Sequence, residues 1–397
     1  MAVIGAGYTG LAAARQLARV GASVVVLERE RVGWGASSRN GGQVLPGLKL
    51  DPATLVARVG QSRARQLFDV SLEALASLEA LIAGEAIECE YERTGHIQAA
   101  SKRAHFEAFR EEQKLLARVF EHRVELVSRA EQRGEIASDA YHGLLVDERS
   151  AAINPAQYAR GLNTAAVRAG AVIAEGTGVE RLSQQSRHWA IETSRGSVDA
   201  GDVLVATNGY TDAAAPALRR RLVPIGSYII ATEPLPVSVA ATLLPRRRVA
   251  FDSKNFLHYF RLTRDFRLLF GGRAEFAPPT AATTPRAAAI LRRDLASVFP
   301  QLEETRIEYA WGGNVAFTRD QLPHAGRLDG THYAGGYCGH GIAMATYLGG
   351  LVARRMAGEP IEHPLMDDRF PAIPLYRGKP WFLPFVGAYY KLRDWIA

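Results

Sequence analysis

Three glycines near the start of the chain have the spacing of a loop that binds phosphate. Gly5, Gly7 and Gly10 follow the apolar residues 2–4 and open a segment rich in alanine and leucine. A glycine turn between a strand and a helix lets the backbone approach a pyrophosphate, and the N-terminus of the helix attracts the negative charge. The residue types and their spacing therefore predict a site for a dinucleotide.

An acidic residue follows at the distance expected of a partner for ribose. Residues 23–27 are rich in valine, which predicts a second buried strand, and Glu28 comes directly after it. A carboxylate there would accept hydrogen bonds from a ribose diol and repel the 2′-phosphate of NADP. The order of strand, turn, helix, strand and acid argues against an unrelated glycine-rich turn, and it leaves NAD and FAD open.

Residues 33–43 form a second glycine-rich turn after the second strand. They contain the pair Gly41-Gly42 and, just before it, Arg39 and Asn40. The glycines would keep side chains away from the far end of a longer dinucleotide such as FAD, and the two polar side chains could donate hydrogen bonds to it. A surface loop is the alternative for this turn taken alone.

A third turn, residues 335–343, favours FAD. Its sequence GGYCGHGIA places the start of a helix near His340. The N–H groups at a helix N-terminus would stabilise negative charge on the N1–C2=O edge of a flavin during reduction. His340 itself is more simply a capping or packing residue than an acid or base.

The elements around these turns predict an α/β protein. We expect a Rossmann-like FAD-binding domain interleaved with an α+β substrate domain built on an antiparallel sheet. The second domain contains an aromatic-rich region with a hairpin near residues 263–266. The predicted FAD-binding domain comprises 1–45, 145–215 and 305–372, the substrate domain 46–144 and 216–304, and an aromatic tail 373–397; the predicted helices include 10–20, 51–82, 101–121, 156–169 and 285–298.

Composition narrows the possible partners. The chain has 397 residues and a net charge of +7, yet no basic block is interleaved with aromatics, so no nucleic acid is expected. Cys89 and Cys338 have neither metal-ligand nor disulfide-framework spacing, which predicts no metal and a reducing, cytoplasmic setting. No apolar run is long enough to span a bilayer. The oligomeric state is left open.

The tail 373–397 is too apolar to be a disordered segment. We expect it to pack against the body of the protein or a partner subunit. Peripheral attachment to the inner membrane through an interfacial anchor is the alternative. Its seven aromatic residues are Tyr376, Trp381, Phe382, Phe385, Tyr389, Tyr390 and Trp395.

Several stretches of the sequence resemble the D-amino-acid-oxidase-like superfamily of FAD-dependent oxidoreductases. They are VIGAGYTGLAAARQLA, GASSRNGGQ, ATNGY and GYCGHGIA, and the resemblance extends over nearly the whole chain. LTRDFRLLFGG and YYKLRDW resemble the gamma-glutamylputrescine oxidase branch. The resemblance implies a small amine or amino acid as substrate, since relatives oxidise pipecolate, iminodiacetate, sarcosine or other amines.

The turns and the resemblance together assign residues to FAD. These residues lie in the three glycine turns, at the end of the second strand, and in or before the ATNGY stretch. The set is Gly5, Gly7, Tyr8, Thr9, Gly10, Glu28, Arg29, Ala36, Ser37, Arg39, Asn40, Gly41, Gly42, Gln43, Val179, Thr207, Asn208, Gly209, Gly336, Tyr337, Gly339, His340, Gly341, Ile342 and Ala343.

The chain departs from these relatives at positions that bear on the chemistry. The stretch VAFTRDQLPHAG lacks the cysteine through which sarcosine-oxidase relatives attach flavin, so FAD is expected to be non-covalent. Ile342-Ala343 replace a lysine that binds carboxylate in those relatives, and Leu269 stands near their oxygen-activating lysine. Sarcosine-type chemistry and fast reaction with O2 are therefore both left open.

The combined features predict FAD-dependent oxidation of an amine or N-substituted amino acid. Hydride transfer to flavin N5 would give an imine that water hydrolyses, and O2 or another acceptor would reoxidise the flavin. This chemistry depends on orientation in a dry pocket, so no acid–base pair is assigned. An FAD-binding subunit or dehydrogenase of a larger complex, and an NAD-linked dehydrogenase, are the alternatives.

Three residues of the antiparallel region are candidates for contact with the substrate. They are Tyr259, Arg261 and His258. Alternation along a strand places Tyr259 and Arg261 on one face and His258 on the other, so they cannot all line one pocket. Arg261 could pair with a substrate carboxylate. A core aromatic or a surface charge is the alternative for each.

Overall fold

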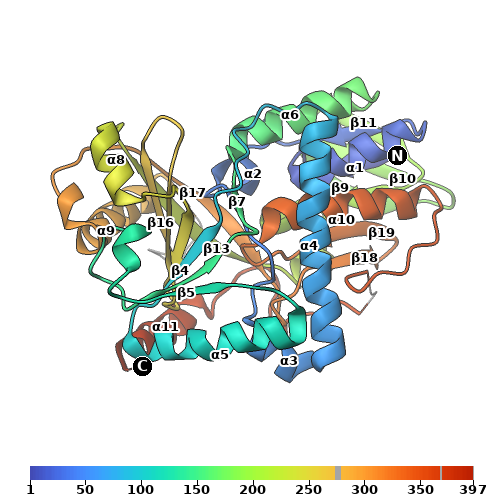
Figure 1. Cartoon of the computed structure of the whole chain (residues 1–397). Coiled ribbons are helices and arrows are strands. Elements are labelled where there is room, and N and C mark those ends of the chain that lie inside the picture. Colours follow the sequence, from blue (N-terminus) through green and yellow to red (C-terminus); the bar gives the residue numbers. More distant parts are fainter. Residues whose placement is uncertain (273–278, 367–368, 397) are drawn as a thin grey trace.

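The computed structural model describes residues 1–272, 279–366 and 369–396, with no side chain described from residue 390 onward. Its two main sheets lie side by side in Figure 1, with the smaller one next to the helices α1 (Tyr8–Arg19) and α10 (Gly341–Met356) and the larger one on the opposite side. The long helix α4 (Gln61–Gly84) runs alongside the part of the molecule that contains the smaller sheet. The predicted α/β class, with one sheet mainly parallel and the other mainly antiparallel, is confirmed.

The smaller sheet contains the dinucleotide-binding unit predicted from the sequence. β1 and β2 are parallel neighbours, and the helix α1 (Tyr8–Arg19) connects them. All three residues of β1 are buried, as expected of a central parallel strand. The strand order is β18 (His324–Leu328), β19 (Thr331–Gly335), β12 (Val203–Val205), β1 (Ala2–Ile4), β2 (Val25–Leu27) and β8 (Val172–Ala174), and only β18 pairs antiparallel.

The larger sheet brings together strands from distant parts of the chain. It is antiparallel except where β14 pairs with β4. The predicted hairpin is confirmed: β15 and β16 are antiparallel and joined by a turn in which the Thr263 N–H donates to the Arg267 carbonyl. The order is β17 (Ile307–Phe317), β13 (Val223–Thr232), β16 (Leu268–Gly272), β15 (His258–Leu262), β14 (Val249–Asp252), β4 (His96–Ala99), β6 (Leu144–Asp147) and β5 (Glu125–Val127).

The helices agree with the predicted ones, with one break. The single helix predicted over 51–82 is two helices, because Gly60 has a φ of +80° and ends α3 (Pro52–Val59) before α4 begins. Asp51 caps α3 by accepting a hydrogen bond from the Thr54 N–H at 2.9 Å. The other helices are α2 (Ala36–Arg39), α5 (Arg103–Phe120), α6 (Pro155–Arg168), α7 (Pro216–Arg219), α8 (Val237–Leu243), α9 (Thr283–Val298), α10 (Gly341–Met356) and α11 (Leu383–Ile396).

The remaining strands form two small sheets outside the main ones. β3 pairs with β7, and three short strands form an antiparallel meander. Their bounds are β3 (Gln43–Val44), β7 (Ala151–Ala152), β9 (Val179–Gln184), β10 (Trp189–Thr193) and β11 (Gly196–Ala200).

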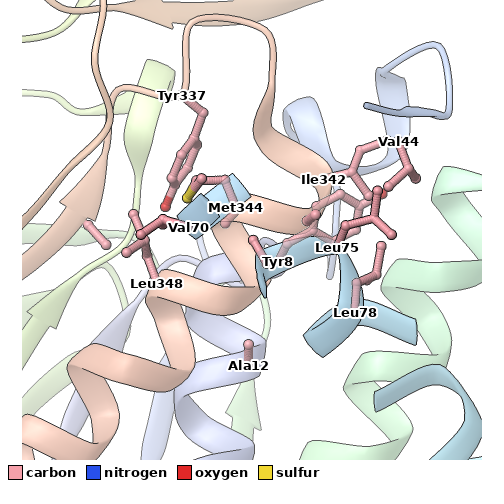
Figure 2. Packing of buried hydrophobic residues seen from close by; sticks show 14 of the residues in the cluster. Tyr8, Ala12, Val44, Val70, Leu75, Leu78, Tyr337, Ile342, Met344 and Leu348 are labelled. Atoms are coloured by element: carbon pink, nitrogen blue, oxygen red, sulfur yellow. The ribbon is translucent and has the colours of Figure 1, made fainter. Parts of the chain in front are cut away.

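The main hydrophobic core joins helices that the sequence assigned to different domains. Leu75 and Leu78 of α4 are buried in one cluster with Ile342 and Leu348 of α10 and with Ala12 of α1. Figure 2 shows these side chains facing one another across the three helices. α4 therefore packs on the dinucleotide-binding half, although it falls within the segment 46–144 predicted for the substrate domain.

The larger sheet contains residues from both of the predicted domains. Residues 307–317, assigned from the sequence to the FAD-binding domain, form β17 and pair with β13. The start of the 145–215 segment lies within β6 of the same sheet. The sequence of either segment alone does not show which strand it pairs with. We propose that the chain returns to the FAD-binding half after Phe317 and after β6.

Part of the aromatic tail packs against the body of the protein. Tyr376 is buried, and its hydroxyl donates to the carbonyl of Leu222 at 2.9 Å. Leu383 is buried in the same cluster with Val223 and Ile225. Trp381, Phe385 and Tyr389 are exposed. The side chains of Tyr390 and Trp395 lie outside the described residues.

Candidate active site

A cavity of about 800 Å³ lies where the two halves of the molecule meet. Its lining comes from the three glycine turns on one side and from a face of the larger sheet on the other. We call these the glycine-turn half and the sheet half of the cavity. A volume of this size is in the upper part of the range of about 300–1,000 Å³ found for ligand sites.

The first glycine turn holds the backbone of α1 close to β1. A Cβ on Gly10 would overlap the carbonyl oxygen of Gly5, so only glycine permits this crossing. The N-cap residue Gly7 has no side chain to cap the helix, and the first turn of α1 contains no acidic residue. The Tyr8 N–H donates to the Ser37 Oγ at 3.0 Å, and the rest of the N-terminus of α1 is open to an anion in the cavity.

Glu28 lies at the end of β2, at the edge of the cavity, as predicted. Its Oε2 accepts a hydrogen bond from the Ala6 N–H at 2.7 Å, and its Oε1 accepts one from the Glu30 N–H at 2.9 Å. These two bonds fix the carboxylate beside the glycine turn. Each oxygen retains acceptor capacity for a ribose hydroxyl.

The second turn is shaped by its own polar side chains. The Asn40 amide donates to the carbonyls of Ala36 and Ser37 at 3.0 Å each. Arg39 donates to the carbonyls of Trp34 at 2.7 Å and Gly312 at 3.1 Å. Both side chains line the cavity, and these hydrogen bonds hold the turn against α2 and β17.

The glycine pair of this turn lies close to other parts of the chain, and its expected role beside the cofactor stays a prediction. A Cβ on Gly41 would press on the ring of Tyr259, and a Cβ on Gly42 would overlap the Ile153 carbonyl and approach Arg261. Gly42 has a φ of +71° and does not line the cavity. The pair therefore allows the second turn to approach the sheet.

The third turn opens α10 toward the cavity. His340 is the N-cap residue of α10, but its side chain makes no capping hydrogen bond. No acidic residue lies in the first turn of the helix. Among the described residues, the Nδ1 atom of His340 has no hydrogen-bonding partner although it is buried. Burial lowers the pKa of His340 to about 3, and the nearby Lys49 and His96 act in the same direction. The imidazole is therefore neutral.

Most of the residues predicted to bind FAD line the cavity. Five of them do not line it, because they contact neighbouring backbone and core atoms instead. These five are Gly10, Gly42, Gly209, Gly336 and Ala343. Those that line it are Gly5, Gly7, Tyr8, Thr9, Glu28, Arg29, Ala36, Ser37, Arg39, Asn40, Gly41, Gln43, Val179, Thr207, Asn208, Tyr337, Gly339, His340, Gly341 and Ile342.

Of the three substrate-contact candidates, only Tyr259 faces the cavity. Its hydroxyl lies 3.0 Å from the Ser227 Oγ. Arg261 shares that face but is buried under the second turn, where it donates to the carbonyls of Gly41 at 2.6 Å and Ile153 at 2.9 Å. Arg261 therefore does not contact the cavity, because the backbone of the second turn takes up its donors.

His258 lies on the opposite face of the sheet and does not line the cavity. Its ring nitrogens are each 3.2 Å from a carboxylate oxygen, one of Asp252 and one of Asp294 on α9. Burial alone would lower its pKa, but the hydrogen bonds to these two carboxylates raise the pKa of His258 to about 9. The predicted alternation of the two faces is confirmed, and a substrate contact by His258 is not.

The sheet half contains residues that the sequence did not single out. Tyr259 pairs with Phe251, and Phe251 pairs with Gln98 on the next strand, so these side chains form a row across the face of the sheet. His96 lies two residues before Gln98 and lines the cavity on the same face. The alternation in residues 94–99 was a signal for the strand, but it could not show which face meets the cavity.

Two histidines of the sheet half are held by defined partners. The Nδ1 of His96 is 2.7 Å from the Ser150 Oγ, and its ring stacks on Phe251. Burial lowers the pKa of His96, which favours the neutral ring. The Nε2 of His122 is 2.6 Å from the Asp147 Oδ2, so the ring and this carboxylate are hydrogen-bonding partners.

Comparison with known proteins identifies the family. The family model described as FAD dependent oxidoreductase matches residues 1–355. The chain belongs to this family. It is 34% identical over 402 residues to the gamma-glutamylputrescine oxidoreductase of Escherichia coli (strain K12), covering 99% of this chain and 92% of that protein. It is 33% identical over 363 residues to the probable oxidoreductase OrdL of Haemophilus influenzae, covering 90% and 82%.

Solved structures share the fold of this FAD-dependent oxidoreductase. Glycine oxidase from Geobacillus kaustophilus superposes with a TM-score of 0.77 at 21% identity, covering 94% of this chain and 98% of that one. L-proline dehydrogenase from P. horikoshii superposes with a TM-score of 0.72 at 20% identity, covering 92% and 94%. Both superpositions show that the chain shares the fold of these enzymes.

The cavity of this family member suits a flavin dinucleotide. Two uncapped helix N-termini open into it, a carboxylate stands at the end of β2, and a buried imidazole nitrogen has no partner among the described residues. These features together match a ligand with a ribose, a pyrophosphate and a polar ring. No helix in the described part of the chain has the length and apolar character needed to cross a membrane.

Proposed function

We propose that this protein oxidises a small amine or an amino acid with non-covalently bound FAD. When bound, FAD would supply the two-electron acceptor for the amine, O2 or another acceptor would reoxidise it, and water would hydrolyse the imine product. The observation that carries the proposal is one cavity with glycine turns on one side and a polar sheet face on the other.

The glycine-turn half would bind the cofactor. The N-terminus of α1 is placed for the pyrophosphate and Glu28 for a ribose diol. The N-terminus of α10 is placed for the ring, where negative charge develops on reduction. The stretch VAFTRDQLPHAG contains no cysteine, which supports non-covalent attachment.

The sheet half would orient the substrate amine. Tyr259 presents an aromatic face and a hydroxyl held by Ser227, and its contact with Gly41 places it at the boundary of the two halves. The residues there position an amine, and none of them is assigned as a general base.

The test is an anaerobic titration of the purified protein, followed by its visible spectrum, with a panel of amines and N-substituted amino acids. We expect flavin absorption bands that bleach with at least one member, and admission of air then distinguishes an oxidase from a dehydrogenase. A protein that remains colourless after incubation with FAD would overturn the proposal. Bleaching without turnover in air would favour an enzyme that passes its electrons to another protein.

A further inference from the structure

One side of the cavity lies beyond the glycine turns, between α3, α5 and the edge of the larger sheet. Its walls are mainly apolar and include Phe68 of α4, Leu116 of α5, Val124 and Leu145. Two carboxylate residues, Glu112 of α5 and Asp51 before α3, line the same side. Figure 1 shows α3 and α5 next to each other, away from α1 and α10.

Glu112 is the carboxylate of this wall that lacks compensation. It is partly buried, and among the described residues its side chain has no hydrogen-bonding or ion-pair partner. Its neighbour Glu111 is exposed and pairs with Lys114, with 2.7 Å between Oε1 and Nζ. Among the described residues, the same helix therefore carries one carboxylate that is paired in solvent and one that lines the cavity without a protein partner.

The surroundings of Glu112 disfavour its negative charge when the cavity holds only solvent. Burial, followed by the nearby charge of Asp51, raises the pKa of Glu112 to about 7. Asp147 is already paired with His122, and Asp51 already caps α3. The positive charge of Lys49 acts to lower the pKa values of His340 and Cys338. The Nζ of Lys254 lies 3.8 Å from the Oδ2 of Asp252. Among the described residues no cationic side chain pairs with Glu112, so this carboxylate is available to a cationic group of a ligand in the cavity.

We propose that Glu112, with Asp51 beside it, binds a second cationic group of the substrate. The inference rests on the proposed amine oxidation in the same cavity. It makes the substrate an amine that is joined by an apolar spacer to an ammonium or guanidinium group. The oxidised amine lies at the flavin end, the spacer lies along the apolar wall, and the second cation lies at Glu112. Glu112 is thus a specificity-determining residue.

The pH dependence of this selectivity follows from the ionisation of Glu112. The carboxyl is neutral below its pKa of about 7 and charged above it, while alkylammonium groups stay protonated throughout that range. The preference for a second cation therefore increases as the pH rises through about 7. The other ionisable residues lining this side are Asp51 before α3, Lys49, His96 on β4, His122 after α5 and Asp147 on β6.

The test compares two probes that differ only in the distal charge, hexylamine and hexane-1,6-diamine. Binding to the FAD-loaded enzyme is measured anaerobically by calorimetry after the flavin has been reduced, so that no turnover can occur. At a pH above 8 we expect the diamine to bind at least about tenfold more tightly, equivalent to one stabilised charge pair. Glu112→Gln should abolish the preference, and the matched control Glu111→Gln should retain it.

Two results would overturn the inference. One is equal binding of the two probes to the native protein, and the other is a preference that survives in Glu112→Gln. Asp51→Asn, which keeps the helix cap, should weaken the preference without abolishing it. If another amine bleaches the flavin while the probes bind equally, the inference fails and the proposed function stands. If the diamine binds through Glu112 and no amine bleaches the flavin, the proposed oxidation fails instead.

Discussion

The two halves of the cavity are built in opposite ways. The glycine-turn half consists of three turns, and each of them lies within a short stretch of sequence: residues 5–10, 33–43 and 335–343. The sheet half consists of single residues on β4, β6, β14 and β15, and the two farthest apart in the sequence, His96 and Tyr259, are separated by 163 positions. A turn that binds a phosphate or a ring edge needs its atoms adjacent along the backbone, whereas a pocket for a small molecule needs only side chains that converge.

The two halves of the cavity are connected through the second glycine turn. Arg261 reaches from the sheet to the second glycine turn, and Tyr259 rests against Gly41. The backbone of the second turn is therefore part of both halves. A chain with this arrangement can keep one cofactor and change its substrate by exchanging residues on the strands.

The largest expected effect is confined to the glycine-turn half. Gly10→Ala would place a Cβ against the Gly5 carbonyl, so α1 must move away from β1. We expect a loss of about 3 kcal/mol in the free energy of unfolding and less FAD per chain, measured by denaturation and by the ratio of flavin to protein absorbance. In the control Gly350→Ala on α10, where a Cβ meets no atom within 4 Å, FAD content should be unchanged. Normal FAD content in Gly10→Ala would contradict the close crossing.

The connection between the halves is tested by Arg261→Met. The substitution removes hydrogen bonds to three buried carbonyls, those of Gly41, Ile153 and Leu262. We expect a loss of about 2 kcal/mol in chemical denaturation, and little change for the exposed control Arg264→Met. An unchanged stability together with a strongly raised KM would instead mean that Arg261 binds the substrate and does not connect the two halves.

On the far face of the sheet, His258 should make the stability of the protein depend on pH without affecting substrate binding. The folded-state pKa of His258 is about 9, above its ordinary value near 6.5. The stabilisation by Asp252 and Asp294 is therefore complete below about pH 6.5 and is lost as the pH rises through 9, with a slope of at most about 1.4 kcal/mol per pH unit. Denaturation between these pH values should show the decline in the native protein and in the exposed control His188→Gln. A decline of the same slope in His258→Gln would assign it to other groups.

The smallest effect is expected on the near face, from Tyr259→Phe. The change removes one hydroxyl, 3.0 Å from the Ser227 Oγ, and keeps the ring against Gly41. We expect unchanged FAD content and a substrate affinity lowered by about 1 kcal/mol, or about fivefold, measured from anaerobic flavin reduction. Tyr309→Phe, at an exposed position of β17, is the control. Loss of FAD in Tyr259→Phe would assign the residue to the glycine-turn half.

The positions of the glycine turns could be predicted because each depends on neighbouring residues. Gly5, Gly7, Gly10 and Glu28 occur within one βαβ unit, whose spacing fixes their relative positions. The tertiary contacts of Gly41-Gly42 could not be predicted in this way. Their close neighbours, Ile153, Tyr259 and Arg261, lie more than a hundred residues away.

The amino-acid sequence by itself determined the cofactor half: local spacing specifies strand, turn, helix and acid, and these specify where a pyrophosphate and a ribose can bind. The tertiary structure alone decided which side of each strand meets the cavity. It placed Tyr259 in the cavity, Arg261 beneath the second turn and His258 behind the sheet. It also brought Glu112 to the cavity wall. The period of a strand tells which residues share a face, but only the packing of the sheet against the rest of the chain tells what that face contacts.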